Sequence, residues 1–175
     1  KEYAKGLSAQ IDLQLAKTVL SHGTPPRVDT KIFDRHTTHI TAVDAEGYWV
    51  AITATVNTSF GSKVIVPGTG VVLNNEMDDF SAKRGASNAY GLIGGNANKI
   101  EPGKRMLSSM TPTIVTTNDD LPFLITGSPG GSTIITTVAQ VISNVIDFKM
   151  NIKDAVESKR FHQQWFPDII QIEKN

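Results

Sequence analysis

The stretch DRHTTHITAVD, residues 34–44, places two adjacent threonines between two histidines and directly ahead of a β-branched run. Thr is an ordinary strand residue, so Thr37 and Thr38 can simply begin a strand. A second interpretation is chemical, because a threonine whose α-amino group is freed by cleavage of the preceding peptide bond can act as a nucleophile. Thr37 would then have to become an N-terminus. The stretch by itself leaves both interpretations open.

Two strand pairs are expected outward from this stretch. The runs THITAVD and YWVAITATV are joined by the short turn AEG, which predicts a hairpin. The runs TIVTT and PFLITG, within residues 113–127, repeat the pattern around NDD. Residues 132–148 then place apolar side chains on a broad helical stripe, and IKDAVES and IIQIEK predict a shorter helix and a last strand. A further helix is expected over residues 2–20, followed by a linker to residue 36.

Composition narrows the classes of function. The 175 residues fit one domain, and 17 Lys and Arg balance 17 Asp and Glu, so the net charge indicates neither nucleic acid nor an anionic membrane as a partner. Cysteine is absent, which excludes disulfides, thiolate metal sites and a cysteine nucleophile. The most apolar stretch, residues 134–148, is too short for a membrane span. No signal segment opens the chain, which we expect to be a piece of a longer protein.

The long connection between the two hairpins, residues 57–112, is rich in Asn, Gly, Ser and Pro, and functional residues are expected in it. At its start, Thr53, Thr55 and Asn57 would share one strand face, which is either a hydrogen-bonding site or a solvated face. LNNEMDDFS, residues 73–81, sets acidic and amide side chains among apolar ones. This cluster suits a substrate ammonium, a Ca²⁺ ion or a plain acidic turn, although the EF-hand spacing is missing.

Two further motifs offer donors to an anionic group. Ser108 and Ser109 in KRMLSSMTP carry adjacent hydroxyls. In TGSPGGS, residues 126–132, Gly130 and Gly131 lie between an expected strand and an expected helix, where their amides can converge on an oxyanion. The same turn can hold a phosphate or no ligand, and it lacks the lysine and the spacing of a P-loop.

The order of these motifs resembles the γ-glutamyltranspeptidase family, in the region of its catalytic small subunit. The resemblance is carried by TTHITAVD, TVNTSFGS, LNNEMDDFS, YGLIGGNAN, KRMLSSMTPTIV, TGSPGGSTIITTV and RFHQQWFPD. The family belongs to the N-terminal-nucleophile hydrolases, so the resemblance implies an α+β fold, part of a four-layer αββα sandwich. It also implies that residues 1–36 are the C-terminal end of the large-subunit region. Residues 37–175 would be the small-subunit catalytic region without its final strands.

The resemblance implies a complete catalytic group. The precursor would cleave itself between His36 and Thr37, and Thr37 would then be the nucleophile, with its amine as general base. The reaction would transfer or hydrolyse γ-glutamyl groups through a threonyl acyl-enzyme. Thr55 would orient the nucleophile, and the amides of Gly130 and Gly131 would form the oxyanion hole.

The resemblance also assigns the residues that would bind substrate. Asn57, Glu76 and Asp79 match residues that hold the α-amino and α-carboxylate region, and Asp79 would pair with the ammonium. Ser108 and Ser109 would bind the α-carboxylate. An arginine for that carboxylate is expected from the part of the large-subunit region that this chain does not contain.

A lid is expected over the pocket. Residues 84–95, with Tyr90, match a loop that covers the pocket in many bacterial members, and such a cover would control the access of water and acceptors. A mobile surface loop in which Tyr90 only packs is the alternative. Phe161 and Trp165 are expected to be packing anchors.

The implied partners are glutathione and other γ-glutamyl compounds, amino-acid or peptide acceptors, water, and the large-subunit region of the same precursor. Neither nucleic acid nor a membrane is expected. No cofactor or metal is expected, since His36, His39 and His162 lack metal-ligand spacing. Bacterial members are usually periplasmic or secreted, which is the implied location. The alternatives are a related N-terminal-threonine acylase, such as a cephalosporin acylase or a polyglutamate depolymerase, and an unprocessed inactive precursor fragment.

Overall fold

The computed structural model describes most of the region that follows Thr37. The described residues are 37–83, 85–164 and 168–174, together with Glu2, Lys5, Gly6, Ala9 and Gln10 near the N-terminus. The chain divides into two units, Lys1–Phe33 and Asp34–Asn175. In the first unit, Glu2, Lys5 and Gly6 are helical, and the Ala9 amide donates to the Lys5 carbonyl at 3.0 Å. Ala9 and Gln10, which the prediction also placed in the helix, form a turn; the remaining residues of the expected helix, the linker and His36 lie outside the described residues.

The first predicted hairpin is confirmed. Strand β1, Thr37–Val43, pairs antiparallel with β2, Trp49–Thr55, and the register sets Thr37 opposite Thr55. Alternate side chains of β2 are half-buried, as expected when only one face of a strand is covered. The hairpin turn places Gly47 at a φ of 91°, a left-handed conformation that glycine adopts without steric cost. The pairing therefore brings the first and last residues of the hairpin to the same end.

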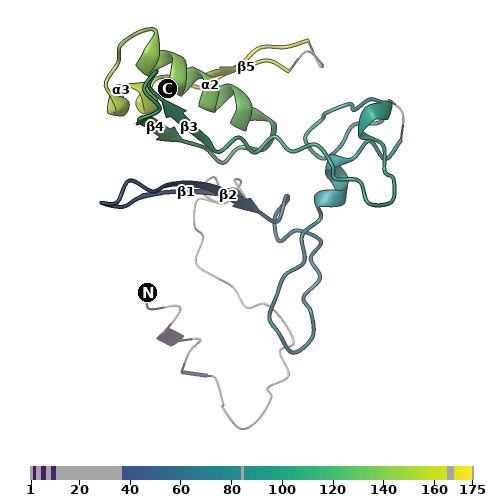
Figure 1. Ribbon diagram of the computed structural model, residues 1–175. Helices are drawn as coiled ribbons and strands as arrows, with labels where there is room; N and C mark the ends of the chain where they lie inside the picture. The colour runs from purple at the N-terminus through teal and green to yellow at the C-terminus, as the bar shows by residue number, and fades with distance from the viewer. Residues whose placement is uncertain are drawn as a thin grey trace. The chain divides into compact units, whose positions relative to one another are not determined.

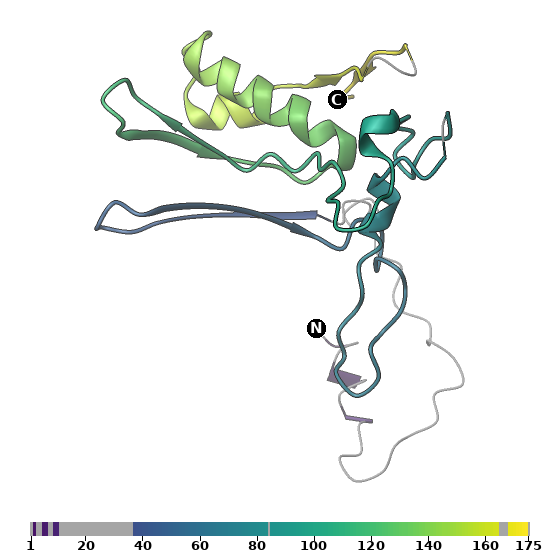
Figure 2. The same ribbon diagram turned by 45° about the vertical axis from the view of Figure 1, so that its right-hand side comes forward.

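The second predicted hairpin and the helix after it are also confirmed. Strand β3, Thr113–Thr116, pairs antiparallel with β4, Pro122–Thr126, and helix α2, Ile134–Ile146, follows the short 3-10 turn η4, Gly131–Thr133. Figures 1 and 2 both show β3–β4 lying between β1–β2 and α2. The side chains that fill this region are Leu124 of β4 and Ile134, Val138 and Val141 of α2. Helix α2 thus fixes one end of the turn that precedes it.

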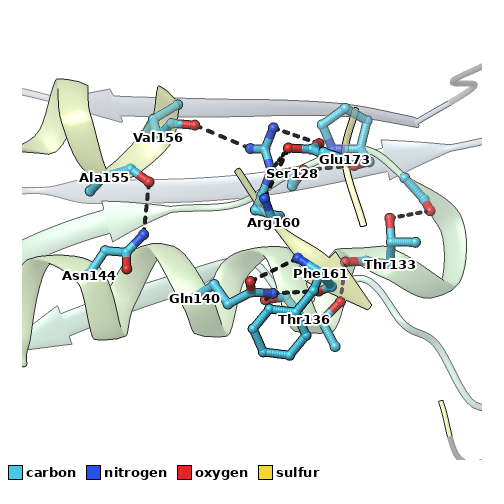
Figure 3. Close-up of polar contacts among 12 residues, drawn as sticks. Ser128, Thr133, Thr136, Gln140, Asn144, Ala155, Val156, Arg160, Phe161 and Glu173 are labelled. Carbon is cyan, nitrogen blue, oxygen red and sulfur yellow. Dashed lines mark hydrogen bonds and ion pairs between the residues drawn. The ribbon is translucent and has the colours of Figure 1, made fainter. Parts of the chain in front are cut away.

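The last part of the chain folds back onto α2. Helix α3, Ile152–Glu157, is followed by the two-residue strands β5, Phe161–His162, and β6, Gln171–Ile172. Figure 3 shows Gln140 of α2 bonded to both backbone groups of Phe161, at 2.7 and 3.1 Å. The side chain of Phe161 is 57% exposed, so its prediction as a packing anchor is wrong; the backbone of Phe161 makes the contact instead. Trp165 lies outside the described residues.

The connection between the hairpins holds little regular structure. Within it lie the 3-10 turns η2, Glu76–Asp79, and η3, Asn96–Asn98, with isolated bridges between Ile65 and Val72, Ser81 and Lys99, and Ser87 and Ile93. Side chains of Asn and Thr bond to its backbone in place of a strand ladder. No described helix is long and apolar enough to cross a bilayer.

Candidate active site

The hydroxyl of Thr37 lies in a defined position at the end of the first hairpin. Thr37 Oγ1 donates to Thr55 Oγ1 at 3.2 Å, a contact that the antiparallel register makes possible. The amide of Asn57 donates to the same Thr55 oxygen at 2.9 Å. Thr55 therefore ties the predicted nucleophile to the start of the long connection.

The backbone conformation of Asn57 differs from the one that the strand pattern predicts. Strand β2 ends at Thr55, and Asn57 adopts a φ of 74°, so the face expected to join Thr53, Thr55 and Asn57 does not continue to residue 57. Thr53 instead bonds to His39 Nδ1 at 2.8 Å. The Asn57 side chain is buried, and its amide nitrogen donates to the Asn75 carbonyl at 3.2 Å. Its own carbonyl accepts the Tyr90 hydroxyl at 2.9 Å.

Two acidic side chains lie three residues apart on the turn η2. Successive turns of a 3-10 helix eclipse residues i and i+3, which brings Glu76 and Asp79 to one side. Burial, a hydrogen bond with Asp79 and the Asp79 charge together raise the pKa of Glu76 to about 7. Burial also raises the pKa of Asp79, and the charge of Asp78 acts in the same direction. Two adjacent carboxyls with raised pKa values form a site at which a cation would favour ionisation.

The serine pair and the glycine turn are joined by a hydrogen bond. Ser109 Oγ donates to the Gly131 carbonyl at 3.0 Å, while Ser108 Oγ accepts the Met110 amide at 3.2 Å. Gly130 and Gly131 have φ values of 141° and 58°, so both lie in the left-handed region that favours glycine. The Tyr90 ring lies against Gly131, where an added Cβ would be 2.6 Å from Tyr90 Cε1.

These groups line one small cavity of about 20 Å³. Every residue predicted for catalysis or substrate binding lines this cavity except Gly130, which directly precedes the lining residue Gly131. The lining consists of Thr37, Thr55, Asn57, Glu76, Asp79, Tyr90, Ser108, Ser109, Gly131, Met110 and Ile134. The structure therefore brings together a threonine pair, an acidic pair and a serine pair that are far apart in the sequence.

The expected lid segment lies beside this cavity. The Ala89 amide donates to Asp78 Oδ2 at 2.8 Å, and Asn88 Oδ1 accepts the amides of Tyr90 and Leu92, each at 3.0 Å. A larger cavity, of about 310 Å³, shares Asp79, Tyr90, Ser108 and Ser109 with the first. Arg84 lies outside the described residues. A role of the segment as a lid stays a prediction.

Two asparagines that the sequence did not single out organise the site. Asn98 is buried; its Nδ2 donates to the Asp79 carbonyl at 2.7 Å, and its Oδ1 accepts the Leu107 amide at 3.0 Å. Asn75 Oδ1 accepts from the amide and the hydroxyl of Thr58, at 3.1 and 3.0 Å. The abundance of Asn in the connection was the only available signal, because no periodic pattern marks which asparagine is buried.

The described residues contain no group of three His, Asp or Glu side chains arranged to hold a metal ion. Burial lowers the pKa of His39, whose ring lies against Gly127.

The family model described as gamma-glutamyltranspeptidase matches residues 1–175, the whole chain. The chain belongs to this family. It is 49% identical over 174 residues to the glutathione hydrolase proenzyme of Escherichia coli (strain K12), covering 99% of this chain and 30% of that protein. It is 47% identical over 175 residues to the glutathione hydrolase proenzyme of Pseudomonas sp. (strain A14), covering 99% of this chain and 29% of that protein. The chain thus spans less than a third of the length of these relatives.

Solved structures agree with this assignment. A Helicobacter pylori γ-glutamyltranspeptidase, the T380A mutant, is 59% identical with a TM-score of 0.76, over 78% of this chain and 73% of that chain. An acivicin-inhibited γ-glutamyltranspeptidase is 58% identical with a TM-score of 0.74, over 77% of this chain and 71% of that chain. The α+β fold of an N-terminal-nucleophile hydrolase, in partial form, is thereby confirmed.

Proposed function

We propose that this chain carries the catalytic centre of a γ-glutamyl transferase and hydrolase, with Thr37 as its nucleophile. The observation that carries the proposal is a single cavity lined by Thr37, Glu76 and Asp79. The Thr37 hydroxyl bonds to that of Thr55 at 3.2 Å. A nucleophile and an acidic pair in one cavity suit a substrate that has both an acyl carbon and an ammonium group. The relatives' names, glutathione hydrolase proenzyme and γ-glutamyltranspeptidase, support the same reaction.

The nucleophile would be produced by the chain itself. The Thr37 hydroxyl attacks the carbonyl of residue 36, the resulting ester is hydrolysed, and the Thr37 amine becomes free. This amine then accepts the hydroxyl proton as Thr37 Oγ1 attacks the γ-glutamyl carbonyl. The bond to the leaving amine breaks, the leaving amine takes the proton, and a γ-glutamyl ester remains on Thr37. Water or an acceptor amine then attacks this ester, releasing glutamate or a new γ-glutamyl compound.

Recognition would be divided between the two sides of the cavity. Glu76 and Asp79 attract the α-ammonium of the γ-glutamyl group, because a carboxylate binds an ammonium by charge-assisted hydrogen bonds. Ser108 donates to the α-carboxylate. Asn57 holds in place the part of the cavity lining between the nucleophile and the acidic pair. The Gly131 amide, with that of Gly130, stabilises the oxyanion formed at the γ-carbonyl.

The proposed partners and location follow from the family. Glutathione and other γ-glutamyl compounds are the donors, amino acids or peptides are the acceptors, and the large-subunit region of the same precursor is the protein partner. A periplasmic or secreted location is proposed, with a role in glutathione metabolism and no membrane or nucleic-acid partner.

The test uses the full-length protein that contains this chain. Intact mass and N-terminal sequencing after purification should give a fragment that begins at Thr37, and this fragment should release amine from a γ-glutamyl anilide and from glutathione. A chain that stays uncleaved after long incubation, and releases neither product, would contradict the proposal.

A further inference from the structure

The turn before α2 is held through the carbonyl of Gly130. Thr133 (Figure 3) donates twice to this oxygen, from its Oγ1 at 2.9 Å and from its backbone amide at 3.2 Å. A Cβ on Gly130 would lie 2.5 Å from Thr133 Oγ1, so the close approach requires a glycine there. Two donors from one residue therefore fix the direction of a single carbonyl.

That carbonyl belongs to the same peptide group as the amide of Gly131. A trans peptide is planar, and its C=O and N–H point in opposite directions, so holding one sets the direction of the other. Gly131 lines the cavity that contains the Thr37 hydroxyl. In the described part of the chain, no acceptor takes a hydrogen bond from the Gly131 amide. The amide proposed to stabilise the oxyanion is thus oriented by Thr133 from behind.

Thr133 occupies a position at which a different bond is usual. It is the N-cap residue of α2, where a threonine hydroxyl commonly accepts a backbone amide of the first helical turn. Its side chain makes no such capping bond. The hydroxyl is directed to the glycine turn instead, while Ser109 holds the next carbonyl, that of Gly131, at 3.0 Å.

We infer that Thr133 is a positioning residue for acyl transfer, which fixes the Gly130–Gly131 peptide so that the Gly131 amide faces the developing oxyanion. The inference rests on the proposed function. Thr133 does not line the cavity and acts through the peptide alone. Removing its hydroxyl should therefore weaken transition-state stabilisation and leave the binding of the γ-glutamyl group unchanged.

The test compares four forms of the full-length, processed protein: the parent, T133V, T133S and T137V. Valine keeps the branched shape of threonine without the hydroxyl, and serine keeps the hydroxyl. Thr137 is the matched control, since it is a half-buried threonine of the same helix for which no side-chain bond is seen in the described chain. Hydrolysis of a γ-glutamyl anilide gives kcat and KM, and calorimetry with glutamate gives ground-state affinity.

The expected result is a loss of kcat of roughly tenfold in T133V, about what one hydrogen bond contributes, with KM and glutamate affinity within about twofold of the parent. T133S and T137V should stay near the parent. A parent-like kcat in T133V would overturn the inference. So would a fall in kcat together with a rise in KM and a loss of glutamate affinity that T133S does not restore, because that pattern indicates a general structural role.

A second readout does not depend on activity. Amide hydrogen exchange of the peptide that spans residues 127–134 should be faster in T133V than in the parent, T133S and T137V. If T133V lacks a folded melting transition, T133A takes its place against T133S. If the parent binds glutamate but hydrolyses no γ-glutamyl compound, the proposed function fails; equal exchange in all four forms would refute the role of Thr133 by itself.

Discussion

The first hairpin and the long connection after it position their parts of the site by different means. Strands β1 and β2 place Thr37 opposite Thr55 through a continuous antiparallel ladder. Residues 57–112 carry the acidic pair and both serines, but hold them by bonds from asparagine side chains to backbone groups. The position of Thr37, the proposed nucleophile, therefore depends on many repeated bonds, whereas the proposed recognition residues depend on a few single ones. Substitutions in the two regions should differ accordingly in what they affect.

The largest effect is expected at Thr37, the proposed nucleophile. Thr37→Ala removes the only hydroxyl proposed to attack, so both self-cleavage and γ-glutamyl hydrolysis should fall to background, while the melting temperature of the precursor stays close to that of the parent. Mass spectrometry reads the first activity and anilide hydrolysis the second. Thr37→Ser keeps a hydroxyl and should retain part of each. Full processing of Thr37→Ala would show that another group cleaves the chain.

In the connection, Asn98 should matter for stability as well as for binding. Asn98→Ala leaves the Asp79 carbonyl and the Leu107 amide without their partner, which we expect to cost about 1–3 kcal/mol of unfolding free energy. KM for a γ-glutamyl donor should rise, because Asp79 and Ser108 lose their shared support. Asn96→Ala, at an exposed position, is the control. Thermal unfolding and steady-state kinetics would measure both, and a variant as stable as Asn96→Ala would exclude the supporting role.

The two regions also differ in how well their structure is predicted from sequence. Alternation of period two, short turns and a helical stripe predicted both hairpins and α2, because those patterns reflect burial of one face. The resemblance to a known family named the residues around the cavity, and the structure brings all of them except Gly130 into its lining. From the local sequence pattern alone, each motif could equally be an ordinary structural element without a function.

What sequence did not predict depends on single bonds and on backbone conformation. The φ of 74° at Asn57 turns its carbonyl toward the Tyr90 hydroxyl, and no alternation signals such a residue. Sequence does not show which asparagine of the connection is buried, because Asn98 bonds to the Asp79 carbonyl, a group distant in sequence. It does not show the bond from Thr133 to the Gly130 carbonyl either, because Thr133 stands at an ordinary N-cap position. Phe161 was expected to be buried from its type, yet its backbone makes the contact.

The acidic pair predicts a pH dependence of intermediate size. The pKa of Glu76 is raised to about 7, so its carboxyl gains a proton as the pH falls through that value. An ammonium binds the ionised form, and the affinity for a γ-glutamyl donor should therefore fall by up to about tenfold per pH unit below pH 7. Glu76→Gln should flatten this profile, whereas Glu46→Gln, at the exposed hairpin turn, should not. An unchanged profile in Glu76→Gln would assign the titration to another group.

The same shift has a consequence for stability of the free protein. Because the folded-state pKa of Glu76 lies above its ordinary value of 4.5, the folded protein disfavours the ionised carboxyl. Its favourable contribution is complete below pH 4.5 and is lost as the pH rises through 7. Glu76→Gln should therefore raise the melting temperature relative to the parent at pH 8 and change it little at pH 4, as scanning calorimetry would measure. A larger rise at pH 4 would contradict the sign.

The smallest effect is expected at Tyr90, in the segment that is proposed to act as a lid. Tyr90→Phe keeps the ring against Gly131 but removes the hydroxyl that donates to the Asn57 carbonyl at 2.9 Å, a bond worth about 0.5–1.5 kcal/mol. A less tightly held segment should admit water more readily, so the ratio of hydrolysis to transfer should rise by about two- to threefold at fixed acceptor concentration. Tyr48→Phe, 72% exposed in the first hairpin, is the matched control. An unchanged ratio in Tyr90→Phe, with a rise for Tyr90→Ala, would mean that the ring and not the hydroxyl closes the cavity.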